Sequence, residues 1–301
     1  MNEVKRFLVT TVGISIETGL RYAIAAGVAW VIFYVIFKRR WLHRKIIEEG
    51  PPGAEVWREI RYSILTLIVF GAVGAVTVFA IRAGMSKMYF RIEKHGWGWF
   101  WVSAGIAVII HDAWFYWTHR LMHHPKLFRV FHRVHHLSTN PTPWAAYSFG
   151  PLEAVIQAAI FPLVVILVPI HPLAFLAFMI WQISFNVIGH TGFEIYPRWF
   201  LDTWFGKFMN TPTNHVMHHE HFRGNYGLYF NVWDRLMGTN HERYEERFRA
   251  VTSRVRPGAG GDERNASRAG DALRQARSKP EAGATCAAAF AAEPREGARG
   301  D

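Results

Sequence analysis

Nine of the sixteen histidines fall into three short groups, and these are the residues best suited to chemistry. The groups read H-R-L-M-H-H from residue 119, H-R-V-H-H from residue 132 and H-V-M-H-H from residue 215. Each contains a pair at i and i+4, and the second and third add a histidine at i+3. On a helix the imidazoles of one group therefore point to one side within a single turn. Such a face can bind a metal ion, and imidazole suits iron, zinc, copper and nickel.

Counting the ligands indicates how many ions fit. Because one ion accepts about four to six donors and a catalytic ion keeps a position open, the sequence predicts two ions. His190, in the sequence Asn186-Val-Ile-Gly-His190, ends an apolar segment that returns to the side of the three groups. We therefore predict nine metal ligands: His119, His123, His132, His135, His136, His190, His215, His218 and His219.

Five further residues lie close to these ligands in the sequence. Asn186 could bind a metal directly or through water, and Asp112 could accept a hydrogen bond from an imidazole. His111 is either structural or a ligand, although it lies about 12 Å along a straight helix from His119. His124 and His221 could tune or line the site. Glu153 is a further candidate for orienting a ligand.

Other metal and cofactor sites are excluded by the residues present. The letters H-H-E-H at 218–221 suggest a zinc protease, but Arg223 stands where its second histidine is needed. A single cysteine, Cys286, excludes disulfide frameworks within one chain and iron–sulfur clusters. No G-x-G-x-x-G fingerprint and no haem-attachment motif occurs, so we expect no bound flavin, haem or nicotinamide.

The elements that must position these residues are apolar. Half of the 301 residues are hydrophobic, and residues 62–81 carry no charge, which is long enough for a helix to cross a bilayer. Residues 22–37 and 96–110 are also apolar, and 154–193 lack Asp, Glu, Lys and Arg. Pro169 and Pro172 divide this last stretch into a hairpin. We predict an all-α integral membrane protein with about four transmembrane or hairpin helices and a cytosolic helical cap that holds a dinuclear metal site.

The distribution of basic residues predicts how the protein is oriented in the membrane. The net charge is +11, and the loop 38–61 holds seven Lys or Arg, which are retained on the cytoplasmic side. Alternation then places the histidine groups on the cytoplasmic side, and in a bacterium the membrane would be the inner or plasma membrane. The amino terminus resembles a signal peptide only weakly, and we expect it to be uncleaved. We predict membrane helices and a basic loop in 1–95, a catalytic domain in 96–245 and a disordered tail in 246–301.

The motifs resemble a known family, the integral-membrane fatty acid hydroxylase and sterol desaturase superfamily. Its boxes, HxxxH, HxxHH and HxxHH, match residues 119–123, 132–136 and 215–219. The surrounding sequence is similar to the sterol C-5 desaturase-like branch over roughly residues 95–240. This similarity extends from HDAWFYWTHRLMHHP to NTPTNHVMHHEHFRGNYGLYFNVWDRLMGT. The resemblance implies two iron ions, O₂ as co-substrate and a membrane lipid that is desaturated or hydroxylated, a sterol-like substrate being favoured over a fatty acid or other acyl lipid.

The chemistry of the side chains is consistent with oxidation of a lipid by iron and O₂. Acids, bases and nucleophiles cannot attack an unactivated C–H bond, whereas a redox metal with O₂ can. The electrons must then come from an external protein, such as a ferredoxin, a cytochrome b5-like carrier or a reductase. Arg120, Lys126, Arg129 and Arg133 could dock that protein or serve lipid headgroups. We expect no nucleic-acid partner, because the positive charge accompanies apolar spans.

A non-enzymatic membrane protein that handles metal or binds haem is the alternative. A transporter needs polar residues inside its spans, and residues 62–81 contain no ionisable group apart from the terminal Tyr62 and no charge. Haem would use two axial histidines and leave six unexplained.

Overall fold

The computed structural model describes residues 2–256, and these residues form helices joined by turns and irregular loops, with two isolated β-bridges. The bridges join Lys45 to Phe193 and Met209 to Phe230. The predicted tail beyond residue 256 lies outside the described residues. The all-α fold class is confirmed.

Four helices are long and apolar enough to cross a membrane. They are α1 (Glu3–Trp30), which the π-helix η1 (Val31–Ile36) extends, α3 (Gly53–Arg82), α4 (Gly96–Met122) and α8 (Pro172–Gly189). Between α4 and α8, the chain forms a shorter apolar pair, α6 (Pro151–Ala158) and α7 (Ile160–Leu167). The predicted hairpin is therefore asymmetric, because Pro172 occupies the first turn of α8 and the two short helices precede it. At 1.5 Å per residue, neither α6 nor α7 alone spans a bilayer.

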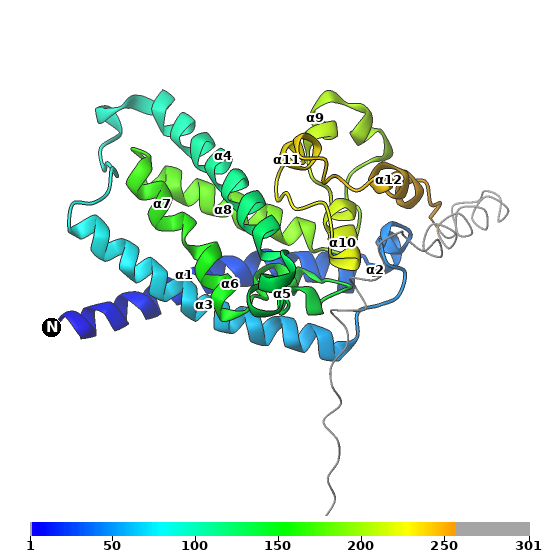
Figure 1. Cartoon of the computed structure of the whole chain (residues 1–301), viewed down its shortest axis with the longest axis horizontal. Coiled ribbons are helices and arrows are strands. Elements are labelled where there is room, and N and C mark those ends of the chain that lie inside the picture. Colours follow the sequence, from blue (N-terminus) through cyan, green and yellow to red (C-terminus); the bar gives the residue numbers. More distant parts are fainter. Residues whose placement is uncertain (1, 257–301) are drawn as a thin grey trace, which may run out of the picture.

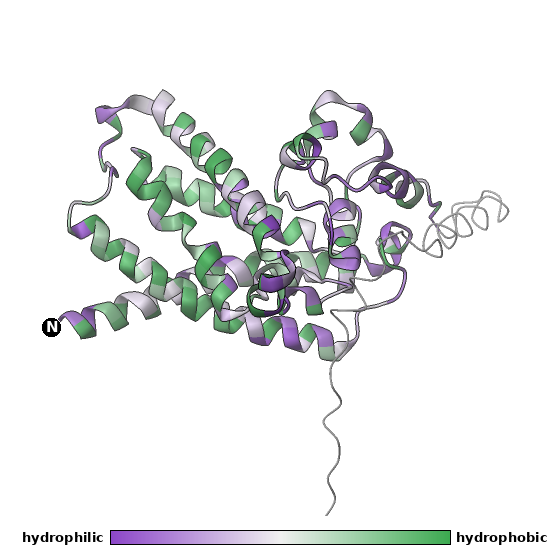
Figure 2. Cartoon of the chain, viewed as in Figure 1, coloured by the Kyte–Doolittle hydropathy of each residue, from purple (hydrophilic) through white to green (hydrophobic). Residues whose placement is uncertain are grey.

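The outward faces of the long helices are apolar. Val12 and Ile24 on α1, and Ile64 on α3, each expose more than half of their surface. Figure 2 shows hydrophobic residues along the part of the bundle nearest the N-terminus, whereas hydrophilic residues gather toward the opposite end. Such a surface is stable in a lipid bilayer and not in water. The protein is an integral membrane protein.

Helices α1 and α3 pack closely along their length (Figure 1). The approach requires glycine at position 71, because a Cβ there would lie 2.0 Å from Ser15 Oγ and 2.5 Å from the Thr11 carbonyl oxygen. Small residues allow the backbones of membrane helices to approach in this way.

Short helices gather around α10 and form a cap at one end of the bundle (Figure 1). They are α2 (Lys38–Trp41), η2 (Leu42–Arg44), α5 (Pro125–Phe131), η4 (His135–Leu137), η5 (Pro143–Tyr147), η6 (Arg198–Asp202), α9 (Trp204–Phe208), α10 (Pro212–His221), α11 (Val232–Leu236) and α12 (Tyr244–Thr252). Another short helix, η3 (Ile92–Lys94), joins α3 to α4 at the other end.

The basic loop after α1 lies against the segments that carry the histidines. The Ile46 backbone N–H donates to the Gly192 carbonyl, and Arg58 donates to the Leu137 carbonyl over 2.7 Å. The loop 38–61 and the histidine groups therefore share one end of the bundle.

One predicted boundary differs from the structure. The disordered tail was expected from residue 246, but α12 continues to Thr252 and buries Phe248 and Val251 against the cap. These two apolar side chains lie three residues apart and so share one face of the helix, a signal too short to stand out in a polar segment.

Candidate metal centre

The first histidine group lies where α4 ends. His119 is in the last turn of α4 and is fully buried, and His123 is the C-terminal cap residue of the helix. The i, i+4 spacing therefore brings both rings to one side of the helix end, as the sequence predicted, and the ring centroids lie 5.0 Å apart.

The second group does not form the predicted helix face. His132 caps the C-terminus of α5, whereas His135 and His136 lie in the 3₁₀ helix η4. The helix ends because the Phe128 carbonyl accepts from both the His132 and the Arg133 backbone N–H groups, which closes a wider final turn. His132 and His136 consequently face one side of the turn and His135 another.

The third group lies on α10, as predicted. The helix begins with Pro212 after Thr211, whose side chain accepts from the Asn214 backbone N–H. All three box histidines of this helix are buried. His190 caps the end of α8 and faces this helix, with its ring centroid 4.3 Å from that of His215.

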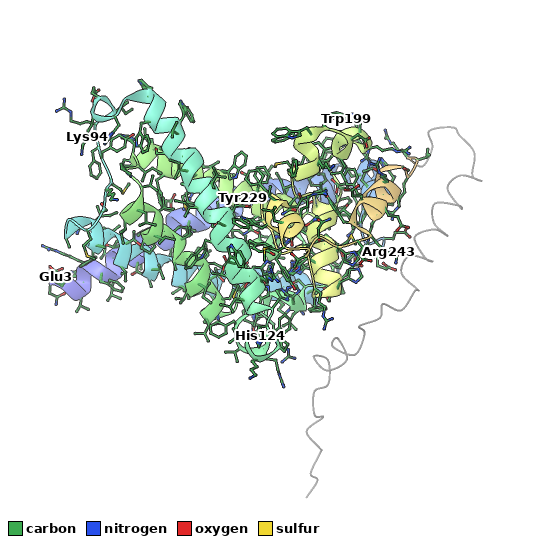
Figure 3. All side chains as sticks on the ribbon, turned by 45° about the horizontal axis from the view of Figure 1, so that its top comes forward. Glu3, Lys94, His124, Trp199, Tyr229 and Arg243 are labelled. Atoms are coloured by element: carbon green, nitrogen blue, oxygen red, sulfur yellow. The ribbon has the colours of Figure 1, made fainter. Side chains whose placement is uncertain are left out.

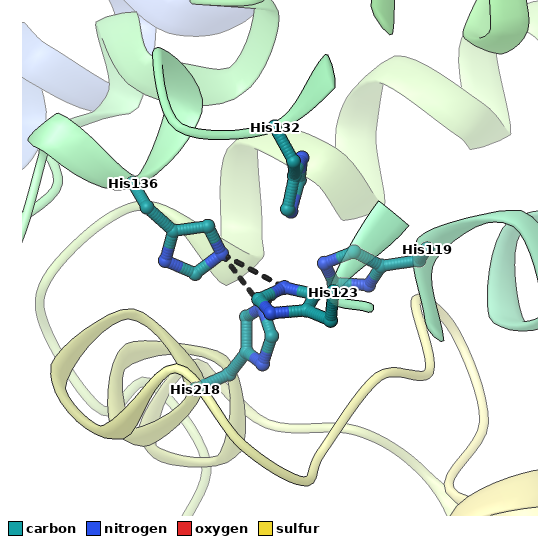
Figure 4. A group of neighbouring side chains, drawn as sticks. All are labelled: His119, His123, His132, His136 and His218. Atoms are coloured by element: carbon teal, nitrogen blue, oxygen red, sulfur yellow. Dashed lines mark hydrogen bonds between the residues drawn. The ribbon is translucent and has the colours of Figure 1, made fainter. Parts of the chain in front are cut away.

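The structure brings all nine predicted ligands together, in two groups. Within each group the ligand atoms all lie within 4.8 Å of one another. The second and third boxes each contribute to both groups, which the sequence pattern alone does not indicate. Group A, drawn in Figure 4, is His119, His123, His132, His136 and His218; group B is His135, His190, His215 and His219.

Backbone carbonyls and one carboxyl fix which nitrogen of several rings points inward. The Nδ1 atoms of His119 and His218 lie 2.8 Å from the carbonyls of Tyr226 and Gly224. In these rings Nδ1 carries the proton, because a carbonyl oxygen only accepts. The Nε2 atom is then an unprotonated donor for a metal ion. The same arrangement holds for His190 with the Asn186 carbonyl (2.7 Å) and His135 with the Ser148 carbonyl (3.4 Å). His132 Nδ1 instead pairs with a carboxyl oxygen, Glu153 Oε1, over 2.7 Å.

The inward Nε2 atoms are better placed to bind a metal ion than to hydrogen-bond with one another. His135 Nε2 and His190 Nε2 lie 3.3 Å apart, yet both rings hold their proton on Nδ1, so two lone pairs face one another. With metal–nitrogen bonds of about 2.0–2.1 Å, ligands on one ion lie roughly 2.9 Å apart at right angles and 3.4 Å apart in a tetrahedron. Neighbouring Nε2 atoms lie 3.0–3.3 Å apart in both groups. In group A, His119 Nε2 and His132 Nε2 are buried without a hydrogen-bond partner.

The electrostatics favour neutral rings. Burial, followed by the charge of neighbouring imidazoles, lowers the pKa of His135, His215 and His219 well below the ordinary value. Burial also lowers the pKa of His190 to about 4. Neutral imidazole is the form that binds metals, so the site is ready for a cation at neutral pH.

The other predicted residues stay outside both groups. The Asn186 side chain donates to the Ala146 carbonyl, and His221 stacks on His241 at 4.7 Å. His124 is exposed at the edge of the molecule (Figure 3). His111 Nδ1 lies 2.7 Å from the Tyr229 hydroxyl. Asp112 was expected to accept from an imidazole, but its Oδ1 accepts from the backbone N–H groups of Tyr229 and Phe230, because that loop packs beside α4.

Sequence reasoning missed two buried carboxylates that hold the ligand segments. Glu194 accepts from the backbone and hydroxyl of Thr213 in the first turn of α10. Asp234 accepts from the backbone N–H groups of Tyr226 and Gly227 and so shapes the loop whose carbonyls orient His119 and His218. Both residues lie within the stretch that resembles the family, but neither has a spacing from the histidines that singles it out.

Comparison with known proteins finds one family match over this region. The family model described as fatty acid hydroxylase matches residues 104–239, which contain every histidine of both groups. Over these residues the chain is similar to the fatty acid hydroxylase family. No solved structure matches it.

Among curated relatives, the chain is 28% identical over 219 residues to the Delta(7)-sterol 5(6)-desaturase ERG3B of Gibberella zeae, covering 73% of this chain and 64% of that protein. It is 29% identical over 188 residues to the lathosterol oxidase of Rattus norvegicus, covering 62% and 61%. The chain therefore spans somewhat less than two thirds of the length of these two relatives. The resemblance to the sterol desaturase-like branch is confirmed.

Proposed function

We propose that this protein is an O₂-dependent di-iron oxidoreductase that desaturates or hydroxylates a membrane lipid. The observation that carries the proposal is the pair of buried histidine groups, in which unprotonated Nε2 atoms face one another at the end of a membrane bundle. Group A would hold one iron and group B the other. Bound iron, with O₂ and two external electrons, supplies an oxidant for an unactivated C–H bond.

The chain's own residues have three tasks in this proposal. They keep the imidazoles neutral by burial, they orient the rings through Nδ1, and they exclude water, since every member of group B is buried. Residues 96–245 form the catalytic domain, and the match over 104–239 supports that boundary.

A sterol-like lipid is the favoured substrate. The relatives named above are described as a sterol 5(6)-desaturase and a lathosterol oxidase, which supports the assignment. A fatty acid or other acyl lipid is the alternative. Desaturation and hydroxylation share the first hydrogen abstraction, so the products must separate them.

The electron donor would be a separate protein, because the chain has no nucleotide or haem motif of its own. We place the histidine groups on the cytoplasmic side, since the seven basic residues of the loop 38–61 share their end of the bundle.

Metal content and lipid products test the proposal together. The detergent-purified chain should contain about two irons without an intense Soret band, and cells with the gene should gain a lipid lighter by two hydrogens or heavier by one oxygen. His135→Ala in group B and His218→Ala in group A should both abolish the product. Undiminished product from both variants, or a single haem iron, would overturn the proposal.

A further inference from the structure

A group of large apolar side chains is exposed on the cap rather than on the long membrane helices. Trp204 exposes 79% of its surface, and Leu236 exposes 72%. Figure 3 shows Trp199 at the outer edge of the molecule. An exposed apolar patch of this kind marks contact with a partner or with a membrane. We call it the α9–α11 face, and it consists of Trp199 on η6, Trp204 and Phe205 on α9, Val232 and Leu236 on α11, and Met237 directly after α11.

Helices α9 and α11 are held next to each other. The Asn231 backbone N–H, just before α11, donates to the Phe208 carbonyl at the end of α9 over 3.0 Å. The isolated β-bridge between Met209 and Phe230 joins the same two segments. Figure 1 shows the two helices side by side on the cap. The exposed side chains of both helices therefore belong to one region of the cap.

This region continues the surface of a membrane helix. Trp233 on α11 packs on Trp117 and Tyr116 of α4, with ring centroids 5.7 and 5.9 Å apart. Trp117 is half-exposed and lies roughly 30 Å along α4 from Gly96, which is about the thickness of the hydrocarbon core of a bilayer. Tryptophan is enriched at that boundary. The α9–α11 face therefore begins where the lipid-facing surface of α4 reaches the edge of the bilayer.

The charges beside the face are suited to lipid headgroups. Arg198 on η6 and Lys207 on α9 are both exposed. The carboxylate on these two helices, Asp202, accepts from Arg249 over 2.8 Å. Exposed cations next to aromatic and aliphatic side chains are typical of helices that lie in the membrane interface, where anionic headgroups attract them.

The opposite side of α11 holds part of group A. Val232 and Leu236 are spaced i and i+4 and share the outer side of the helix, whereas Asp234 is fully buried. Asp234 accepts from the backbone N–H groups of Tyr226 and Gly227, over 2.9 and 2.7 Å. The Tyr226 carbonyl in turn orients the His119 ring. One short helix therefore links the exposed face to the loop that orients a predicted ligand.

We propose that the α9–α11 face is a second membrane contact, which inserts into the headgroup region of the bilayer on the side of the cap. The occupant is lipid, because the face continues the lipid-facing surface of α4 and carries exposed cations. The contact fixes the depth of the loop held by Asp234 relative to the bilayer. This inference goes beyond the proposed function, since it requires neither bound metal nor turnover.

Spin labels measure the depth of the face directly. Cys286→Ser removes the single cysteine of the full-length chain, and Phe205→Cys or Leu236→Cys then provides one labelling site. The chains are reconstituted into vesicles of phosphatidylcholine and phosphatidylserine. Collisions of each label with O₂, which concentrates in the bilayer, are compared with collisions with a water-soluble nickel chelate.

Two further labelled chains are the references. Ile64→Cys lies on the exposed apolar surface of α3, and Glu246→Cys replaces an exposed side chain of α12. We expect the labels at 205 and 236 to show an O₂-to-nickel collision ratio several-fold higher than the label at 246 and closer to that at 64. Each chain should unfold in detergent at the wild-type temperature, and the two sites are labelled separately so that one poorly folded chain does not decide the result.

A charged substitution tests the insertion itself. With the label at 205, Leu236→Glu should raise collisions with the nickel chelate several-fold, because a carboxylate is costly to bury in lipid. Leu236→Met keeps an apolar side chain and is the matched control, which should leave the ratio unchanged.

The outcomes are distinct. Nickel collisions at 205 and 236 as frequent as at 246 would place the face in water and overturn the inference. Infrequent collisions with both reagents would show that protein covers the face, either a second copy of the chain or an electron carrier, and would also overturn it. Absence of an oxidised lipid product would overturn the proposed function and leave this inference standing.

Discussion

His132 Nδ1 lies 2.7 Å from Glu153 Oε1, and both side chains are almost completely buried. The two residues are 21 positions apart, on the turn after α5 and on the first turn of α6. The carboxyl oxygen fixes the ring so that His132 Nε2 points into group A. Glu153 is therefore a positioning residue, which acts on the centre through His132.

Glu153→Gln should weaken iron binding by about 10- to 100-fold, because the amide no longer draws the His132 Nδ1 proton as strongly. The measurement is iron per chain after dialysis against a graded chelator. Glu93→Gln is the control, since Glu93 is exposed at the other end of the bundle. Restored binding in Glu153→Asp would identify the carboxylate as the active feature, and wild-type affinity in Glu153→Gln would refute the positioning role.

Removing one box histidine should empty one site. His218→Ala deletes an Nε2 that lies 3.0 Å from His136 Nε2, so iron should fall from about two to about one per chain and product formation should drop at least 100-fold. His124→Ala, an exposed neighbour of His123 outside both groups, should keep both irons. Elemental analysis and product quantification check both variants. Loss of iron from the His124→Ala variant would show that the assignment of ligands to the two groups is wrong.

Glu194 should contribute to the stability of the protein, because it holds the start of α10. Glu194→Ala removes the acceptor for the Thr213 backbone N–H and hydroxyl at the start of α10, leaving buried donors unpaired. We expect a loss of about 2–3 kcal/mol in the free energy of unfolding and weaker iron binding. Thermal unfolding in detergent measures the first effect. Glu245→Ala, a half-exposed ion pair with Arg235, should cost less than about 1 kcal/mol. Equal losses in the two variants would contradict the role.

Lys45 should make the free energy of unfolding depend on pH in the alkaline range. Its ammonium is buried beside Asn140 and Phe193, and desolvation lowers its pKa from 10.5 to about 8. Between about pH 8 and 10.5 the unfolded chain holds this proton and the folded chain does not, so stability rises with pH in that window. Relative to Lys45→Met, the wild type should gain on the order of 2 kcal/mol from pH 7.5 to pH 10. Comparing the two chains removes the contribution of other titrating groups.

Paired thermal unfolding curves at several pH values provide the measurement. A constant difference between wild type and Lys45→Met across pH 7.5–10 would show that the buried amine does not release its proton in this window.

The sequence alone indicated most of the apolar helices and the candidate ligand histidines, although the first helix begins at Glu3, well before the predicted apolar run 22–37. Long uncharged runs, such as 62–81 in α3 and 96–110 in α4, can satisfy their backbone polar groups in a bilayer only as helices, so both helices were predictable from composition. Histidines at i, i+3 and i+4 share a helix face by local geometry, which holds for His215, His218 and His219 on α10.

Only the tertiary structure decided how these residues pair. His135 and His136 are adjacent in sequence but belong to different groups, because α5 ends before them and the chain turns. The carbonyls that orient two of the rings, those of Tyr226 and Ser148, come from segments 107 and 13 residues away. Such contacts depend on long-range packing and leave no periodic signal along the chain. The sequence therefore indicated the candidate ligands, and the fold decided which of them lie in the same group.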